Sequence, residues 1–306
     1  MTIHSLRKTF GAVAAAFAAS SLFAADFPSK TVRIINPFPP GGSVDLVARL
    51  LGADLGKTWG QQVIVDNRAG ASGNIGTEVA KNSAPDGYTL LLHTLPFVTN
   101  QFVYTTLPFD PLADFAPVSV VTALDSLLVV HPSLPVHTVR ELIALAKAKP
   151  GALSYGTAGP ATNPHIAGEL LNYLGKVNIT AVHYKGGGPA TTAVISGEMQ
   201  MYFSNTIADA MPQVEPKRLR ALGVTSLKRS PVAPQIPTLA ESGLPGYEFS
   251  TWHVLAAPAA TPRALITQIN DTLRRILRTP EAVQRWRERG IDLVVNTPDE
   301  AAAHLK

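Results

Sequence analysis

The sequence of 306 residues contains no cysteine. This absence excludes disulfides, thiolate nucleophiles, cysteine-ligated zinc and iron–sulfur clusters. Charged residues make up 16% of the chain, which is below the usual share of about 25%. Hydrophobic residues make up 46%, so enough apolar surface is available for burial to exclude a disordered chain.

The sequence also lacks the signatures of common enzyme classes. It contains no G-x-G-x-x-G dinucleotide loop, no Walker loop, no H-E-x-x-H zinc motif and no G-x-S-x-G nucleophile elbow. Its eight histidines are scattered singly, without the spacing of metal ligands. We therefore expect no catalytic residue, no metal site and no cofactor. An α/β hydrolase or lyase stays open as an alternative, because the members of a catalytic triad can lie far apart in sequence.

The N-terminus has the pattern of a targeting segment. Arg7 and Lys8 precede an uncharged, apolar stretch over residues 9–24, which is shorter than the about 20 residues of a membrane span. This pattern predicts a secretory signal peptide over residues 1–24. Arg7 and Lys8 supply half of the formal net charge of +4. Since no clustered basic patch remains elsewhere, we expect no binding to nucleic acid.

Short, apolar, β-branched runs alternate with helical patterns along the rest of the chain. Such runs are typical of buried strands. Seven are expected, over residues 32–35, 63–65, 89–92, 127–130, 179–184, 199–203 and 221–225. The alternation predicts an α/β architecture with mostly parallel sheets.

Helix starts are marked by cap residues and prolines. Thr138 with Glu141 three residues later is the pattern of a capping box. Helices are also expected to begin at Asn163-Pro164 and at Pro189. Pro at the first helical position after a cap residue is expected at three Thr-Pro pairs, residues 261–262, 279–280 and 297–298.

Two extended apolar stretches, residues 117–130 and 247–258, interrupt this alternation. We interpret them as crossings between two lobes. The first lobe is then discontinuous, comprising residues 26–123 plus 248–306, and the second comprises residues 124–247.

Three glycine-rich turns follow expected strands and precede expected helices, at residues 37–45, 156–159 and 185–189. Glycine leaves backbone N–H groups unobstructed at the positive end of a helix dipole, where anions bind. Ser43 is expected to cap the first of these helices, and Asp45 to stabilise its dipole. Because ligands of open α/β sheets bind beyond the carboxyl ends of the strands, the turns together favour an anion-binding cleft.

The same segments resemble the receptors of tripartite tricarboxylate transporters, the Bug family. The resemblance runs from about residue 28 to the C-terminus, and its motifs keep their order and spacing. They are residues 37–45 (PFPPGGSVD), 67–76 (NRAGASGNIG), 85–90 (PDGYTL), 164–169 (PHIAGE), 184–190 (YKGGGPA), 219–225 (LRALGVT) and 237–243 (PTLAESG).

This resemblance implies a periplasmic binding protein of type II, with two α/β lobes joined by two crossing strands. It implies a monomeric periplasmic receptor that captures a small organic carboxylate between the lobes for a cognate membrane transporter. A receptor that presents its ligand to a signalling system is the alternative. The ligand-binding residues implied are Phe38, Pro40, Gly41, Gly42, Ser43, Asn74, Thr94, Leu95, Pro96, Ser126, Thr157, Ala158, Gly159, His165, Lys185 and Asn205.

Some of these residues have a structural alternative. His165 can serve in the first turn of a helix, Lys185 as a surface cation and Asn205 in a turn. The chain also departs from the family at Asp125, where relatives usually have an apolar residue or Pro-Asn. A carboxylate there would repel an anionic ligand, which favours a ligand carrying an amine, hydroxyl or amide. Relatives also usually extend further past the last expected helix, so a shortened terminal helix is expected.

Overall fold

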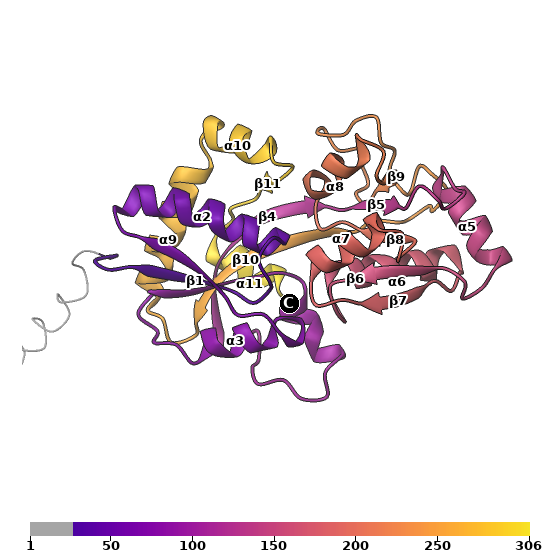
Figure 1. Ribbon diagram of the computed structural model, residues 1–306. Coiled ribbons are helices and arrows are strands. Elements are labelled where there is room, and N and C mark those ends of the chain that lie inside the picture. Colours follow the sequence, from indigo (N-terminus) through magenta and orange to yellow (C-terminus); the bar gives the residue numbers. More distant parts are fainter. Residues whose placement is uncertain (1–26) are drawn as a thin grey trace, which may run out of the picture.

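The computed structural model describes residues 27–306, and the expected signal peptide, residues 1–24, lies outside the described residues. Two mixed sheets, each covered by helices, form two lobes (Figure 1). The sheet of the first lobe has the spatial order β11 (Asp292–Leu293), β4 (Phe115–Asp125), β10 (Ser250–Pro258), β3 (Thr89–His93), β1 (Val32–Asn36) and β2 (Val63–Asn67). The sheet of the second lobe has the order β7 (Thr180–His183), β6 (Ser154–Thr157), β8 (Met201–Phe203), β5 (Leu127–Val130) and β9 (Arg220–Val224).

Helices lie on both faces of each sheet. One face of the first sheet is covered by α2 (Ser43–Trp59), α9 (Arg263–Leu277) and α10 (Pro280–Arg287). The other face carries α3 (Asn74–Lys81), α4 (Pro96–Thr99) and the region of α11 (Pro298–His304), with the short 3-10 turns η1 (Ala71–Gly73) and η2 (Asn100–Phe102) nearby. The second sheet lies between α5 (Val139–Ala148) with α6 (Asn163–Gly175) and α7 (Gly187–Ile195) with α8 (Ile207–Val214). Burial on both faces explains why the central strands β3 and β5 are almost wholly apolar.

All seven expected strands are present, with ends shifted by up to two residues. The expectation of mostly parallel sheets is wrong. β1 is parallel to β2 and β3, and β6 is parallel to β7 and β8, but all other pairs are antiparallel. The reason is the connection between the lobes. A strand that arrives from the other lobe enters a sheet at its carboxyl edge, so β5 and β10 run against their neighbours.

The two crossing segments lie side by side. β4 in the first sheet leads through Ser126 alone into β5 in the second, and β10 returns to the first sheet. The Ser126 backbone N–H donates to the Thr225 hydroxyl at 2.9 Å, and the Ser126 carbonyl accepts from the Thr225 backbone N–H at 3.0 Å. Ser250 pairs with Asp125. The first crossing is therefore held by Thr225 at the end of β9 and by Ser250 at the start of the second crossing, where the lobes join.

The expected helix starts are confirmed at three threonines. The hydroxyls of Thr138, Thr279 and Thr297 each accept a backbone N–H from the first turn of the following helix. At Thr297 the Glu300 carboxylate returns a bond to the Thr297 backbone N–H at 2.8 Å, which completes a capping box. α6 begins at Asn163, as expected.

Three other helix starts differ from expectation. Ser43 does not cap α2, because it is the first helical residue and the extended Gly42 takes the cap position. The Asp45 carboxylate accepts a hydrogen bond from the Gly41 N–H at 3.1 Å, so this backbone donor has a partner that does not involve Ser43. α9 begins one residue after Pro262, which stands at its cap rather than at its first position. α7 begins at Gly187, two residues before the expected proline.

Among residues 27–306, no helix combines the length and the apolar character that crossing a membrane requires.

Candidate ligand-binding site

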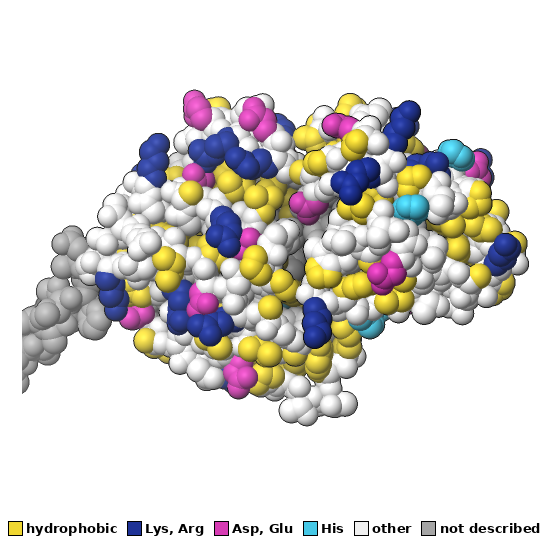
Figure 2. All heavy atoms as spheres, viewed as in Figure 1, with side chains coloured by type: hydrophobic (Ala, Val, Ile, Leu, Met, Phe, Trp, Pro, Cys, Tyr) yellow, Lys and Arg dark blue, Asp and Glu magenta, His cyan; other side chains and the backbone are white. Residues whose placement is uncertain are grey.

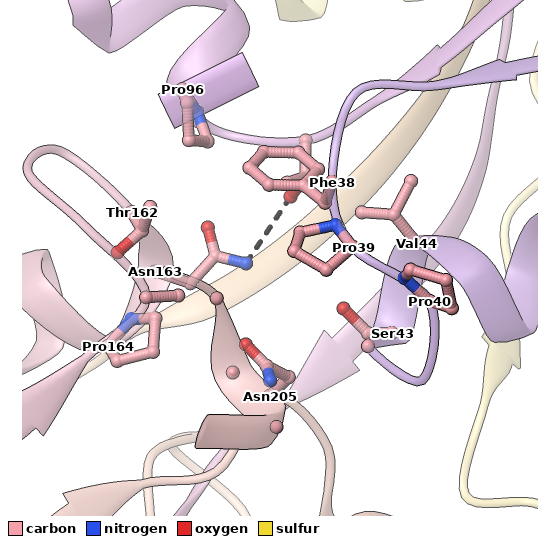
Figure 3. A pocket seen from close by; sticks show the side chains of 16 residues that line it. Phe38, Pro39, Pro40, Ser43, Val44, Pro96, Thr162, Asn163, Pro164 and Asn205 are labelled. Carbon is pink, nitrogen blue, oxygen red and sulfur yellow. Dashed lines mark hydrogen bonds between the residues drawn. The ribbon is translucent and has the colours of Figure 1, made fainter. Parts of the chain in front are cut away.

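A cavity open to solvent, with about 460 Å³ of empty space, lies between the two lobes. The first lobe contributes Phe38, Pro39, Pro40, Gly42, Ser43, Val44, Thr94 and Pro96. The second lobe contributes Ala158, Thr162, Asn163, Pro164, Gly186, Gly187, Gly188 and Asn205. Figure 3 shows these residues facing one another from the two lobes.

Helix N-termini converge on the cavity. The first residues of α2, α6 and α7, which are Ser43, Asn163 and Gly187, all line it. N–H groups in a first helical turn have no partner within the helix, and the helix dipole adds positive potential there. No lining residue carries a charged side chain. The cavity can therefore hold an anion through neutral N–H and O–H donors, without a Lys or Arg.

Gly187 has a specific packing role in this arrangement. A Cβ atom at this position would lie 2.4 Å from Asn205 Nδ2 and 3.1 Å from the Tyr202 hydroxyl. The Asn205 amide is held in place because its Nδ2 donates to that hydroxyl at 3.0 Å. Only glycine lets the start of α7 approach the Asn205 side chain this closely.

The lobes touch around the cavity. Asn163 Nδ2 donates to Thr94 Oγ1 at 3.3 Å, and the Thr99 hydroxyl donates to the Ala161 carbonyl at 3.1 Å. A Cβ atom on Gly186 would lie 3.0 Å from Pro39 Cγ in the other lobe. Figure 2 shows the two lobes meeting along a seam on the face in view. The arrangement is therefore one in which the lobes have closed on each other.

The structure brings half of the sixteen expected site residues to this cavity. These are Phe38, Pro40, Gly42, Ser43, Thr94, Pro96, Ala158 and Asn205. They include members of the turns at residues 37–45 and 156–159, and the third turn, residues 185–189, reaches the cavity through Gly186, Gly187 and Gly188. The turns are distant in the sequence but meet at one cavity, as the rule for open α/β sheets predicts.

The other eight expected residues do not line the cavity. They are Gly41, Asn74, Leu95, Ser126, Thr157, Gly159, His165 and Lys185. Several of them form hydrogen bonds within their own lobe. The Gly41 N–H donates to the Asp45 carboxylate, and Asn74 Oδ1 accepts from Asn100 Nδ2 at 2.6 Å. The Leu95 carbonyl accepts backbone N–H groups of the short α4 segment.

In the second lobe the remaining residues also make internal contacts. The Thr157 hydroxyl bonds to His183 Nδ1 at 2.6 Å, and the Gly159 carbonyl accepts from the Thr162 hydroxyl at 2.6 Å. His165 Nδ1 accepts the Ala161 N–H at 3.1 Å, and burial together with the neighbouring His183 lowers its pKa. Lys185 is exposed. His165 thus lies in the first turn of α6 and Lys185 on the surface of the second lobe, and their part in ligand binding stays a prediction.

Eight lining residues were not expected. Pro39, Val44 and Gly186–Gly188 lie inside the glycine-rich turns, so the sequence did carry a signal for them. Asn163 and Pro164 were expected only as a helix start, and nothing in the sequence pointed to Thr162. Asn163 matters most, because its side-chain oxygen is buried without a hydrogen-bond partner.

Asp45 and Asp125 do not line the cavity. Burial alone would raise the pKa of Asp45, but hydrogen bonds from Arg49, Asn67 and Gly41 outweigh it and lower that pKa. Burial raises the pKa of Asp125, and the nearby carboxylate of Asp292 adds to the increase. The Asp125 carboxylate therefore offers no argument about the groups that the ligand carries.

Two buried histidines lie behind the first-lobe wall of the cavity. The His93 ring packs edge-on against Phe38, with 5.4 Å between ring centroids, and His253 Nδ1 bonds to the Thr122 hydroxyl at 2.8 Å. Burial lowers the pKa of each histidine to about 3. Both imidazoles are therefore neutral near pH 7 and support the wall without adding charge.

Two α/β lobes, joined by two crossing strands with a cavity between them, define a periplasmic binding protein of type II. A family model described as "Tripartite tricarboxylate transporter family receptor" matches residues 47–304. The chain is 34% identical to the protein BugT of Bordetella pertussis over 295 residues, which cover 96% of this chain and 90% of BugT.

Two solved structures from Rhodopseudomonas palustris are also similar. Rpa4515 with adipate has a TM-score of 0.89 at 36% identity, covering 92% of this chain and 94% of its own. MatC with bound malate has a TM-score of 0.84 at 30% identity, covering 91% and 96%. The chain therefore belongs to the tripartite tricarboxylate transporter receptor family, as its motifs predicted. It is a solute-binding receptor and not an enzyme, and the hydrolase or lyase alternative finds no support.

Proposed function

We propose that this receptor holds a small organic carboxylate in the cavity between its lobes. The observation that carries the proposal is the convergence of three helix N-termini on a cavity lined by no charged side chain. Such a site stabilises one negative charge through N–H groups and helix dipoles. The similar structures that hold adipate and malate support the same ligand class.

We assign the carboxylate contacts to the loop before α2 and the loop before α7. Gly42 and Ser43 provide the contacts of the first loop, and Gly187 provides the contact of the second, together with Asn205 from the loop between β8 and α8. Phe38, Pro40, Pro96 and Ala158 supply apolar walls. Because the two loops belong to different lobes, a ligand bound to both would stabilise the closed arrangement.

The cellular setting is part of the same proposal. Residues 1–24 act as a signal peptide that directs a monomeric receptor to the periplasm, where it delivers its ligand to a cognate membrane transporter. The family to which the chain belongs supports this setting. The proposed lobe limits are residues 26–123 plus 248–306 for the first and 124–247 for the second. The ends of β4 and β10 near Asp125 and Ser250 support these limits.

A thermal-shift panel of carboxylates tests the proposal. A ligand at 100 times its Kd adds about 2.7 kcal/mol of stability, and each kcal/mol raises Tm by about 2 °C in a protein of this size. We expect an increase of several degrees with at least one of propionate, malate, adipate, citrate and benzoate. No shift with any mono-, di-, tri- or aromatic carboxylate would contradict the proposal.

A glycine variant links the shift to the cavity. Gly187→Ala places a methyl group against Asn205 and is expected to remove most of the ligand-induced shift. Gly52→Ala in α2 is the matched control, because its Cβ would make ordinary contacts of 3.6 Å with Val63 away from the cavity. Equal shifts in the two variants would place the ligand elsewhere.

A further inference from the structure

Asn163 combines burial, position and an unsatisfied group. It is the first residue of α6, is 3% exposed and lines the cavity. Its Nδ2 donates to Thr94 Oγ1 across the lobe boundary at 3.3 Å, whereas its Oδ1 is buried and has no partner. Figure 3 shows the carboxamide between Thr162 and Phe38, with its nitrogen directed to this bond and its oxygen turned away from it.

A second hydroxyl is compatible with this direction of the bond. Thr94 Oγ1 also lies 3.0 Å from Thr251 Oγ1 on β10, and both threonines are buried. A hydroxyl has one proton to donate and two lone pairs to accept with. If Thr94 donates its proton to Thr251, it can accept from Asn163 Nδ2. The carboxamide oxygen is then left free to accept a hydrogen bond.

The unpaired oxygen is unusual within the described part of the chain. Residues 27–306 contain other buried side-chain atoms without a partner, such as His93 Nε2 and Asn100 Oδ1, but of these residues only Asn163 lines the cavity. A buried acceptor without a donor is unfavourable. The helix N-termini around the cavity provide backbone N–H donors for an anion. The cavity therefore combines these donors with one buried hydrogen-bond acceptor, the side-chain oxygen of Asn163.

We propose, resting on the proposed function, that the ligand is a hydroxycarboxylate and that its hydroxyl donates to Asn163 Oδ1. An ammonium group would also donate, but a buried cation needs an anionic partner. No residue lining the cavity is acidic, so the neutral hydroxyl is the better match. Asn163 is thus the residue that distinguishes a hydroxycarboxylate from the same acid without its hydroxyl.

Calorimetric titration with matched ligand pairs tests this assignment. The pairs are lactate and propionate, malate and succinate, and citrate and tricarballylate, each differing by one hydroxyl. The wild-type protein is expected to bind the hydroxylated member of at least one pair about five- to tenfold more tightly, as one net hydrogen bond provides. Asn163→Leu keeps a similar volume without the acceptor and is expected to reduce this ratio to about one.

Thr99→Val is the matched control. It removes the other side-chain bond between the lobes, from the Thr99 hydroxyl to the Ala161 carbonyl, at a residue that does not line the cavity. It is expected to weaken both members of a pair equally and to leave their ratio unchanged. A reduced ratio in Thr99→Val as well would assign the preference to lobe closure and overturn the role of Asn163.

The remaining outcomes separate this inference from the proposed function. Equal affinity for both members of every pair in the wild-type protein, or a preference that survives in Asn163→Leu, overturns the inference and leaves carboxylate binding intact. A preference for the member without the hydroxyl overturns it too. Binding of none of these acids overturns the inference, and it overturns the proposed function as well when adipate and benzoate also fail to bind. The wild-type comparison needs no variant, and Asn163→Ala replaces Asn163→Leu if the latter does not fold.

Discussion

Gly290 offers a way to change ligand affinity without touching the ligand. It lies between α10 and β11 in the first lobe and faces Ala208 of α8 in the second (Figure 1). A Cβ atom on Gly290 would lie 2.9 Å from the Ala208 Cβ and 3.2 Å from its backbone nitrogen, closer than the optimal carbon–carbon separation of about 3.5–4.0 Å. Separating the lobes removes the clash, so Gly290→Ala is expected to disfavour the closed arrangement.

The magnitude follows from the contact. Overpacking at a well-packed position costs about 1–3 kcal/mol. Because this penalty falls on the closed arrangement, it appears as a coupling energy against ligand binding, and 1–3 kcal/mol corresponds to an affinity about 5- to 150-fold weaker. Gly290 also has a left-handed φ of +70°, in which alanine costs about 1–2 kcal/mol. That second cost applies whether the lobes are open or closed, so it lowers stability but not affinity.

Gly60→Ala separates the two effects. Gly60 ends α2 with a left-handed φ of +64°, and a Cβ atom there would meet nothing within 4 Å. Both variants are expected to lose similar stability in urea denaturation, whereas only Gly290→Ala is expected to bind the carboxylate more weakly by calorimetric titration. An unchanged Kd in Gly290→Ala would refute the reasoning, because it would mean that the Gly290–Ala208 contact is absent from the ligand-bound arrangement.

Three further predictions concern stability. Thr297→Ala removes the capping box of α11 and is expected to lower the free energy of unfolding by about 1 kcal/mol in urea denaturation. The lowered pKa of Asp45 means that its ionised form stabilises the fold above its ordinary pKa of 3.8 and that this contribution is lost as pH falls. Asp45→Asn should therefore cost about 1.5 kcal/mol at pH 7, and a loss that persists unchanged at pH 3 would contradict the reasoning. His93 and His253 have pKa values lowered to about 3, so below the ordinary 6.5 only the unfolded chain takes up their protons. Stability should fall by about 1.4 kcal/mol per pH unit for each histidine between pH 6 and 4, and an unchanged slope of unfolding free energy against pH in His253→Asn would contradict this.

Local signals in the sequence were sufficient for most of the fold. Apolar β-branched runs marked seven strands, and threonine caps marked α5, α10 and α11. Strand direction could not be predicted from local composition. β5 and β10 have the composition of parallel strands, but each enters its sheet from the opposite lobe. Their reversal is a property of the connection and not of any residue within them. The cap of α2 was also misassigned, because the helix begins at Ser43 itself and Gly42 takes the cap position without a side-chain bond.

The candidate site likewise has residues that the local sequence could predict and residues that it could not. Glycines before a helix signal an anion site locally, because their effect depends only on free N–H groups and the dipole of the helix that follows, and all three turns reached the cavity. Asn163 gave no such signal, since its importance arises from a bond to Thr94, which lies 69 positions earlier in the chain. We propose that the glycine-rich loops select the carboxylate class through their backbone N–H groups. The choice among carboxylates is then assigned to Asn163, whose contact with Thr94 forms only in the folded chain.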